Sequence, residues 1–101
     1  MVTGYYRVFP DSETCLTTTG IDSAEQQWWN EQGDKLDLTL ADASSGDSTV
    51  IFSPVNFSGH DLCSQTAWIQ SLQEHAPFHP NGKGQKVIAE TIARTYEALK
   101  K

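Results

Sequence analysis

Apolar and polar positions along the chain fall into blocks that predict strands and helices in turn. The first nine residues, MVTGYYRVF, are rich in β-branched and aromatic side chains and end at Pro10, which predicts a strand that runs into a loop. A polar, turn-rich stretch follows at residues 11–20. The run TVIFSPV at residues 49–55 is a short apolar block after a turn cluster, a pattern typical of a buried parallel strand.

Two segments have the periodicity and the end signals of helices. The first begins in IDSAEQQWW, where Asp22 or Ser23 can cap the helix and an acidic or amide side chain stands three residues later. Its apolar residues continue at helical spacing, and Gly33 within the stretch permits a kink. The second helix is predicted from Asn81 to Leu99, with apolar side chains along one face.

A shorter helix is predicted for TAWIQSLQEH, residues 66–75, which would end before Pro77. The order of strand, helix, strand and helix predicts an α/β fold with parallel strands, a right-handed crossover and a long C-terminal helix. In open sheets of this kind, ligands bind beyond the carboxyl ends of the strands. The residues expected at that face are the segment 5–10, Phe57, His60 and His79.

Composition and charge limit the classes of protein that fit the chain. Its 101 residues, 38% of them hydrophobic, suit one globular domain. The net charge is -6 and the only adjacent cations are Lys100 and Lys101, so we expect no nucleic-acid partner. No apolar run reaches the length of a transmembrane segment, and the first ten residues lack the features of a signal peptide.

The two cysteines, Cys15 and Cys63, lie in polar, loop-like segments rather than in apolar runs. Such positions favour a disulfide over two core thiols, and two unrelated free thiols are the alternative. A disulfide that closes a loop of this length would stabilise the fold by about 4 kcal/mol in the chain-entropy model.

Histidine spacing raises the question of a metal site. His75 and His79 are four residues apart, like zinc ligands on a helix, and the run HDLC at residues 60–63 has a ligand-like gap. Pro77 between the two histidines argues against a continuous helix that would place both rings on one side. We therefore expect no metal site and no cofactor.

The stretch APFHPNGKG, residues 76–84, places His79 between Phe78 and Pro80 just before the last helix. As plain structure, this histidine is a loop residue ahead of a helix that Asn81 can cap. As chemistry, it is an imidazole on a short, stiffened loop at the edge of the sheet, where a general base is expected. The residues by themselves leave both interpretations open.

A resemblance to a known family favours the second interpretation. The run FSGHDLCS, then Trp68 and the block FHPNGKGQKVIAETI resemble the C-terminal part of secreted SGNH hydrolases, the GDSL lipase and esterase family. The stretch VTGYYRVFP and the loop with Cys15 are similar to the preceding part of its extracellular lipase-like members. The resemblance covers most of the chain and implies part of a three-layer α/β/α, flavodoxin-like fold.

The resemblance also implies roles for individual residues. His79 would be the catalytic base, which accepts the proton of a serine hydroxyl that attacks an ester carbonyl. The family commonly has an aspartate three residues before this histidine, but Ala76 stands there and would supply only its main-chain carbonyl. A Ser–His dyad rather than a triad is then implied. The disulfide of the family maps onto Cys15 and Cys63.

Three aromatic residues and one serine have weaker links to the implied chemistry. Phe57, Trp68 and Phe78 either line an acyl pocket or belong to the core, as bulky aromatic residues usually do. The triplet GDS that ends at Ser48 matches the start of the family's nucleophile motif. It precedes a predicted strand instead of following one, so we interpret Ser48 as a turn residue.

The resemblance does not include the serine, glycine and asparagine blocks of the family, which precede the matched region. We therefore expect residues 1–101 to be the C-terminal portion of one SGNH hydrolase domain, inactive without the N-terminal part and with an exposed strand edge. The complete protein would be extracellular and would act on a small-molecule or lipid ester. The alternative is a non-catalytic α/β remnant, or a module that binds a partner through the exposed sheet edge.

Overall fold

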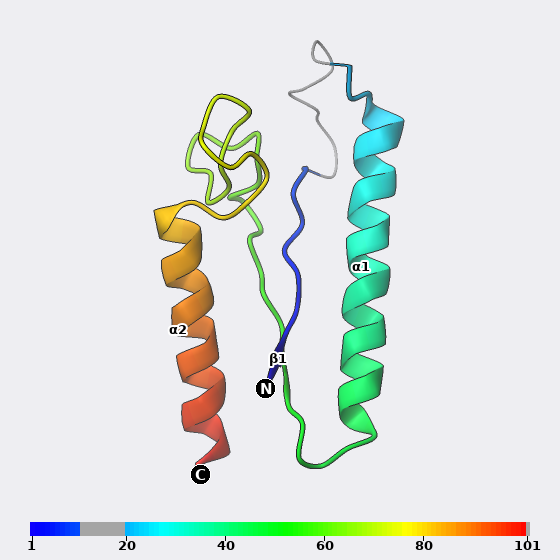
Figure 1. Cartoon of the computed structure of the whole chain (residues 1–101), viewed down its shortest axis with the longest axis vertical. Helices are drawn as coiled ribbons and strands as arrows, with labels where there is room; N and C mark the ends of the chain where they lie inside the picture. The colour runs from blue at the N-terminus through cyan, green and yellow to red at the C-terminus, as the bar shows by residue number, and fades with distance from the viewer. Residues whose placement is uncertain (11–19, 101) are drawn as a thin grey trace.

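The computed structural model describes residues 1–10 and 20–100 (Figure 1). Its elements are β1 (Val2–Thr3), α1 (Ser23–Ser45), β2 (Phe52–Ser53) and α2 (Gly82–Leu99). The predicted alternation of strands and helices is confirmed. Neither of these two helices is long and apolar enough to cross a membrane, within the residues described.

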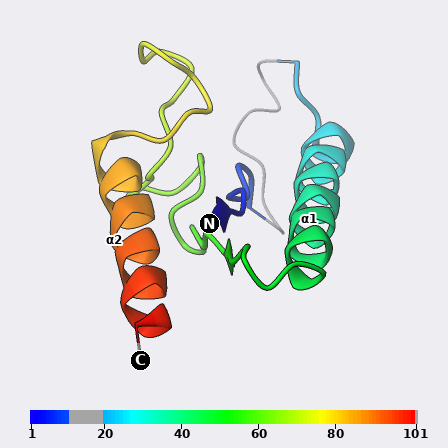
Figure 2. The ribbon, with the colours of Figure 1, turned by 60° about the horizontal axis from the view of Figure 1, so that its bottom comes forward.

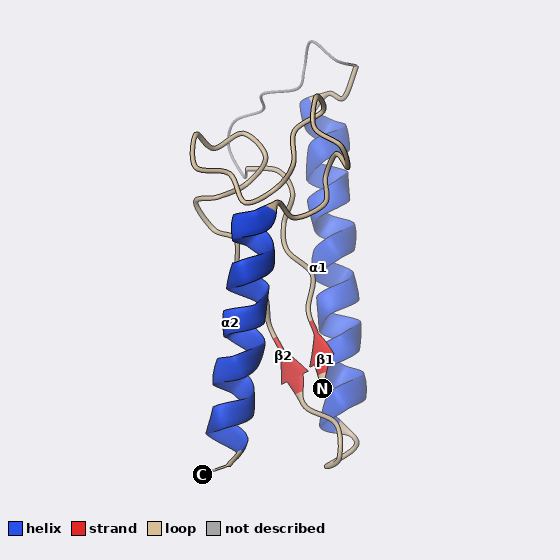
Figure 3. Cartoon of the chain, turned by 60° about the vertical axis from the view of Figure 1, so that its left-hand side comes forward, coloured by secondary structure: helices blue, strands red, loops and turns tan. Residues whose placement is uncertain are grey.

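The two strands are parallel, as predicted, but each is only two residues long. Val2 pairs with Phe52 and Thr3 pairs with Ser53. Hydrogen bonds of 2.8 Å join the main-chain N–H of Val2 to the carbonyl of Ile51 and that of Gly4 to the carbonyl of Ser53. Beyond this ladder both segments continue side by side towards a group of loops (Figures 1 and 3).

The helices lie on opposite sides of the strand pair, which gives an α/β/α arrangement (Figures 2 and 3). Asp22, one of the two residues predicted as a cap, caps α1, and Asn81 caps α2 as predicted. At α1 the Asp22 carboxylate accepts from the Glu25 main-chain N–H at 2.8 Å, and the Glu25 carboxylate accepts from the Asp22 N–H, which completes a capping box. At α2 the Asn81 side chain accepts from the Gly84 N–H at 2.9 Å.

The shorter helix predicted for residues 66–75 is wrong. This segment forms turns and an antiparallel bridge between Ile69 and Pro80. The main-chain N–H of Gln70 donates to the carbonyl of His79 at 2.8 Å, and that of Asn81 donates to the carbonyl of Trp68 at 2.9 Å. Pairing with the residues before α2 therefore satisfies the backbone of this segment, which a helix would otherwise do.

Most of the apolar core lies where the extended segments meet the loops. The buried apolar residues in the described part of the chain are Tyr6, Val8, Phe9, Val55, Phe57 and Ile69. The buried residues of α1 are polar, and Asn30 among them accepts from the Phe9 N–H at 3.3 Å and donates to the Phe9 carbonyl at 2.8 Å. Polar side chains thus fix α1 beside the first extended segment.

Candidate active site

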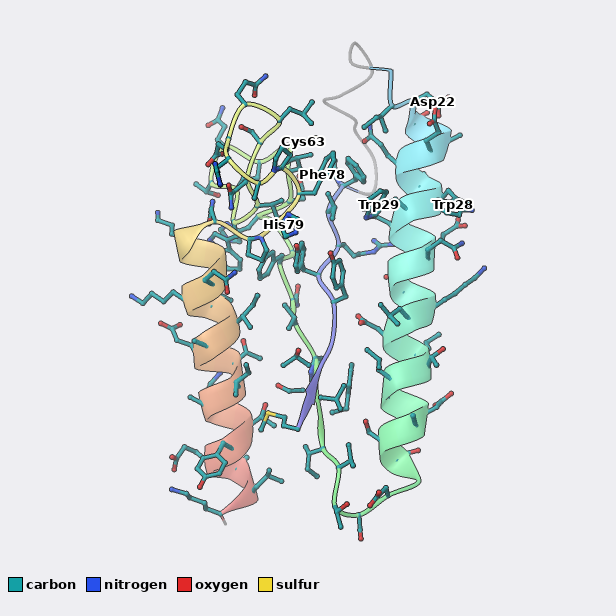
Figure 4. All side chains as sticks on the ribbon, viewed as in Figure 1. Asp22, Trp28, Trp29, Cys63, Phe78 and His79 are labelled. Atoms are coloured by element: carbon teal, nitrogen blue, oxygen red, sulfur yellow. The ribbon has the colours of Figure 1, made fainter. Side chains whose placement is uncertain are left out.

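His79 lies beyond the carboxyl ends of the two strands, next to the start of α2 (Figure 4). Its side chain is exposed, whereas Phe78 and Pro80 on either side are half-buried. The sequence predicted an imidazole on a restrained loop at this edge of the sheet, and the fold brings the residue there. An exposed ring at the carboxyl edge of a parallel sheet can reach a substrate or a second side chain.

The imidazole of His79 has a defined partner on one side. Its Nδ1 lies 3.1 Å from the main-chain carbonyl oxygen of Pro77. A carbonyl oxygen only accepts hydrogen bonds, so Nδ1 carries the proton of the neutral ring and donates it. Nε2 then holds the lone pair, which is the atom that a general base needs.

The carbonyl that contacts the ring differs from the one that the resemblance implies. Ala76 was expected to supply it, but the Ala76 carbonyl accepts from the main-chain N–H of His79 at 3.1 Å and closes a turn. Pro77, one residue later, supplies the oxygen that faces Nδ1. A main-chain carbonyl therefore contacts the imidazole, with the register shifted by the turn.

Phe78, directly before His79, has a strained backbone. Its φ is +71°, a left-handed conformation that costs about 1 to 2 kcal/mol for a residue with a side chain. The hydroxyl of buried Tyr6 donates to the Phe78 carbonyl at 2.8 Å. The Phe78 ring packs near Phe9 and Trp29, with ring centres 6.1 and 5.8 Å apart (Figure 4). These contacts offset the strain and fix the turn.

Gln70 forms hydrogen bonds along the whole of the His79 loop, which we define as residues 76–80. Its main chain donates to the carbonyl of His79 at 2.8 Å and accepts from the N–H of Phe78 at 3.1 Å. Its side-chain Nε2 donates to the carbonyl of Pro80 at 3.1 Å, and its Oε1 accepts from the N–H of Ala76 at 2.9 Å. One residue thus pairs with the loop at both ends and at its centre.

His60 has a similar hydrogen bond but a different environment. Its Nδ1 lies 2.7 Å from the Thr66 carbonyl, and its ring stacks on Trp68 at 3.6 Å between ring centres with 5° between the planes. This stacking fits a packing role within the loops. His75 is exposed. In residues 1–10 and 20–100 no group of three or more His, Cys, Asp or Glu side chains is placed to hold a metal ion.

The three aromatic residues considered for a pocket do not line one cavity together. Phe57 is buried and stacks on Tyr6, with ring centres 4.7 Å apart, and Trp68 packs edge-on against Phe57. Phe78 instead borders an apolar cavity of about 480 Å³ between the His79 loop and the start of α1. The other residues of its lining are Phe9, Ile21, Asp22, Ala24, Glu25, Trp28 and Trp29. The core interpretation fits Phe57 and Trp68. The cavity beside Phe78 is lined in addition by Trp28 and Trp29, which the sequence analysis did not single out.

Ser48 lies in the turn between α1 and β2, as the sequence predicts. The turn is closed by Asp47, whose carboxylate accepts from the N–H and the hydroxyl of Thr49 at 2.8 and 2.6 Å. These hydrogen bonds lower the pKa of Asp47. The turn is at the end of the molecule opposite His79 (Figures 1 and 4). Ser48 therefore lies far from the imidazole along the strands.

Cys63 belongs to the loops near His60, and its main-chain N–H donates to the Asp61 carboxylate at 2.8 Å. Cys15 lies outside the described residues, so the disulfide between the two stays a prediction.

Sequence reasoning missed the two residues that hold the His79 loop. Tyr6 lies in an ordinary strand-like block, and Gln70 lies in a segment whose composition predicts a helix. Neither residue belongs to a motif. Their roles depend on contacts between segments that are far apart in the chain, such as the 2.8 Å bond from Tyr6 to Phe78.

Comparisons with known proteins relate this geometry to one class of enzyme. No family model and no curated protein matches the chain. Its structure is similar to the crystal structure of an extracellular lipase from Streptomyces rimosus, with a TM-score of 0.70 and 26% sequence identity. The similarity covers 89% of this chain and 41% of the lipase chain. The chain therefore has an α/β fold similar to part of a lipase, and it spans less than half of that enzyme's length.

Proposed function

We propose that the chain is the C-terminal portion of an extracellular carboxylic-ester hydrolase of the SGNH type, with His79 as its general base. One observation carries this proposal. The exposed imidazole of His79 lies beyond the carboxyl ends of parallel strands, and its Nδ1 is held by a main-chain carbonyl at 3.1 Å. The similarity to an extracellular lipase supports the reaction class and the location.

In the proposed reaction, a serine from the N-terminal part of the domain is the nucleophile. Its oxygen attacks the ester carbonyl while Nε2 of His79 takes the hydroxyl proton, and the imidazolium then protonates the departing alkoxide. Water attacks the acyl-serine in the same way, which releases the acid and restores the serine. The Pro77 carbonyl faces Nδ1–H throughout, so it keeps the ring oriented and favours its positive charge. A base of this kind contributes about 10² to 10⁴ in rate.

The apolar cavity beside Phe78 suits the hydrocarbon part of an ester. Trp28 and Trp29 border it and are 60% and 43% exposed, so apolar surface faces the space next to the His79 loop. Covering such surface with an acyl chain would contribute about 0.8 kcal/mol per buried methylene.

The second candidate is a non-catalytic module that binds a protein partner. The exposed apolar side chains along the helices favour it, because such surface usually marks a contact. Besides Trp28 and Trp29, they are Leu36 and Leu38 on α1 and Ile92, Tyr96 and Leu99 on α2. The N-terminal part of a hydrolase domain would cover the same surface, so exposure alone does not separate the two candidates. A measurement of ester hydrolysis does separate them.

A chimaera of this chain with the related lipase separates the hydrolase from the non-catalytic module, and we call it the graft. The part of the Streptomyces rimosus lipase that this chain matches is replaced by residues 2–100, and hydrolysis of a chromogenic short-chain ester is measured. We expect activity in the graft, a loss of at least about 10² in kcat for His79→Ala, and less than a threefold change for His75→Ala. Circular dichroism before each assay identifies the folded grafts.

A second graft carries only residues 76–84 and covers the case in which the larger graft does not fold. A folded larger graft in which His79→Ala is as active as His75→Ala, or a folded smaller graft in which His79→Ala is as active as the unsubstituted graft, would contradict the proposed base. A larger graft that is folded but inactive would favour the non-catalytic module.

A further inference from the structure

We propose that Tyr6 and Gln70 are positioning residues for His79, because they hold the His79 loop in the backbone conformation that places Nδ1 of the imidazole against the Pro77 carbonyl. The importance of these hydrogen bonds for catalysis rests on the proposed role of His79. Their effect on the conformation of the loop concerns only the isolated chain and is testable without any reaction.

The side-chain amide of Gln70 spans the loop from its first residue to its last. Its oxygen accepts from Ala76 at the start of the loop and its nitrogen donates to Pro80 at the end, at 2.9 and 3.1 Å. The two bonds need opposite hydrogen-bonding roles, which the oxygen and the nitrogen of one amide supply. The main chain of Gln70 adds the two bonds to Phe78 and His79, so four hydrogen bonds keep the five residues of the loop in place.

Tyr6 holds the strained point of the loop. Its ring is stacked between Tyr5 and Phe57, with ring centres 4.6 and 4.7 Å away, and it is 7% exposed. The hydroxyl donates to the carbonyl of Phe78, the residue at φ +71°. Burial raises the pKa of Tyr6 above its usual value of 10.0, so the hydroxyl keeps its proton and stays a donor.

These bonds act on His79 through its neighbours. Phe78 is fixed through its N–H and its carbonyl, and Pro80 is fixed through its carbonyl. Removal of the Tyr6 hydroxyl frees the Phe78 carbonyl, and removal of the Gln70 amide frees Ala76 and Pro80 at the two ends of the loop. In either case Phe78 can leave the left-handed conformation, and Pro77 turns with it. The Pro77 carbonyl then no longer meets Nδ1, and the proton of the neutral ring distributes between both nitrogens.

The test is long-range ¹H–¹⁵N NMR of the imidazole rings in the full chain, at alkaline pH where ordinary histidines are neutral. Tyr6→Phe removes one hydroxyl, and Tyr5→Phe is its matched control on the neighbouring exposed ring. Gln70→Met removes both roles of the amide at similar volume. His60 is the internal reference, because its Nδ1 bonds to Thr66 and not to the His79 loop.

We expect His79 to be protonated at Nδ1 in the natural chain and in Tyr5→Phe. In Tyr6→Phe and Gln70→Met, we expect both tautomers of His79 while His60 keeps its single tautomer. An unchanged His79 spectrum in both variants would overturn the inference. So would loss of the defined tautomer at both histidines, because it would show a general stabilising role.

The lipase graft provides a second readout that separates this inference from the proposed function. There we expect Tyr6→Phe to lower kcat about 10- to 100-fold with little change in KM, because a displaced base affects the chemical step. If His79→Ala leaves the graft active, the proposed function fails whatever the NMR shows. If His79→Ala inactivates it and Tyr6→Phe and Gln70→Met do not, only the positioning inference fails.

Discussion

The two ends of the molecule are stabilised in different ways. The loop end, residues 5–9 and 54–81, has hardly any regular secondary structure but contains the buried apolar core. The helix end, residues 1–4, 34–53 and 86–100, consists mainly of two well-formed helices around two short strands. Several of its large apolar side chains, such as Leu38 and Tyr96, are exposed, and a hydrogen bond between the hydroxyls of Ser53 and Thr95 links α2 to β2.

This difference shows that regular structure and tight packing are separate properties. Turns can be rigid when their main-chain groups are paired, as Gln70 pairs with the His79 loop. Helices can be well formed and still leave apolar surface open, as α1 does at Leu38. The candidate site is therefore supported by contacts within the chain. In our proposal the helix end is completed by the N-terminal part of the domain, in line with the chain's 41% coverage of the lipase.

The largest expected effect comes from truncating the core of the loop end. Ile69 is 1% exposed, so Ile69→Ala should lower the free energy of unfolding by about 2 to 5 kcal/mol. Leu38→Ala at the helix end removes a similar volume from a side chain that is 66% exposed, and should change it by less than about 0.5 kcal/mol. Urea unfolding followed by circular dichroism measures both. Equal losses would show that the two ends are packed alike.

The predicted disulfide would add a covalent restraint to the loop end. If Cys15 and Cys63 are joined, Cys63→Ser should cost about 4 kcal/mol in the free energy of unfolding. Mass spectrometry of non-reduced peptides identifies the bond directly. Alkylation of both thiols in the native protein without reductant would exclude it.

Substitution of two glycines by alanine tests whether packing is tighter next to the loops than along α1. A Cβ on Gly84, at the start of α2, would overlap the carbonyl of Trp68, so Gly84→Ala should destabilise the chain by about 1 to 3 kcal/mol. A Cβ on Gly33, in the middle of α1, meets nothing within 4 Å, so Gly33→Ala should stabilise by up to about 1 kcal/mol. Thermal melts of the two variants should shift in opposite directions. Shifts of the same sign would contradict the described packing of α2 against the loops.

Alkaline pH should weaken the loop end through Tyr6. Its pKa is raised by burial, so the unfolded chain loses this proton at lower pH than the folded chain. Stability should be unaffected by Tyr6 below about pH 10 and should fall above it by about 1.4 kcal/mol per pH unit. Urea unfolding between pH 9 and 11 spans the onset of this fall. It should show the fall in the natural chain and less of it in Tyr6→Phe. Identical slopes would mean that Tyr6 ionises normally.

Sequence reasoning succeeded where the determinants are local. The caps at Asp22 and Asn81 depend on residues three positions apart, and both are present as expected. The placement of His79 followed from the order of elements and from the family resemblance. The helix predicted for residues 66–75 failed because Gln70 pairs with residues 78 and 79, a choice that tertiary contacts make. The shift from Ala76 to Pro77 depends on the φ of Phe78, for which the sequence has no glycine as a signal.

The central claim is that His79 is a general base, and chemical rescue tests it most directly. In the folded lipase graft, we predict that His79→Ala loses ester hydrolysis and that added imidazole restores part of it in proportion to its concentration. The same imidazole should leave the His75→Ala graft unchanged. Full activity of the His79→Ala graft without any imidazole would contradict the account.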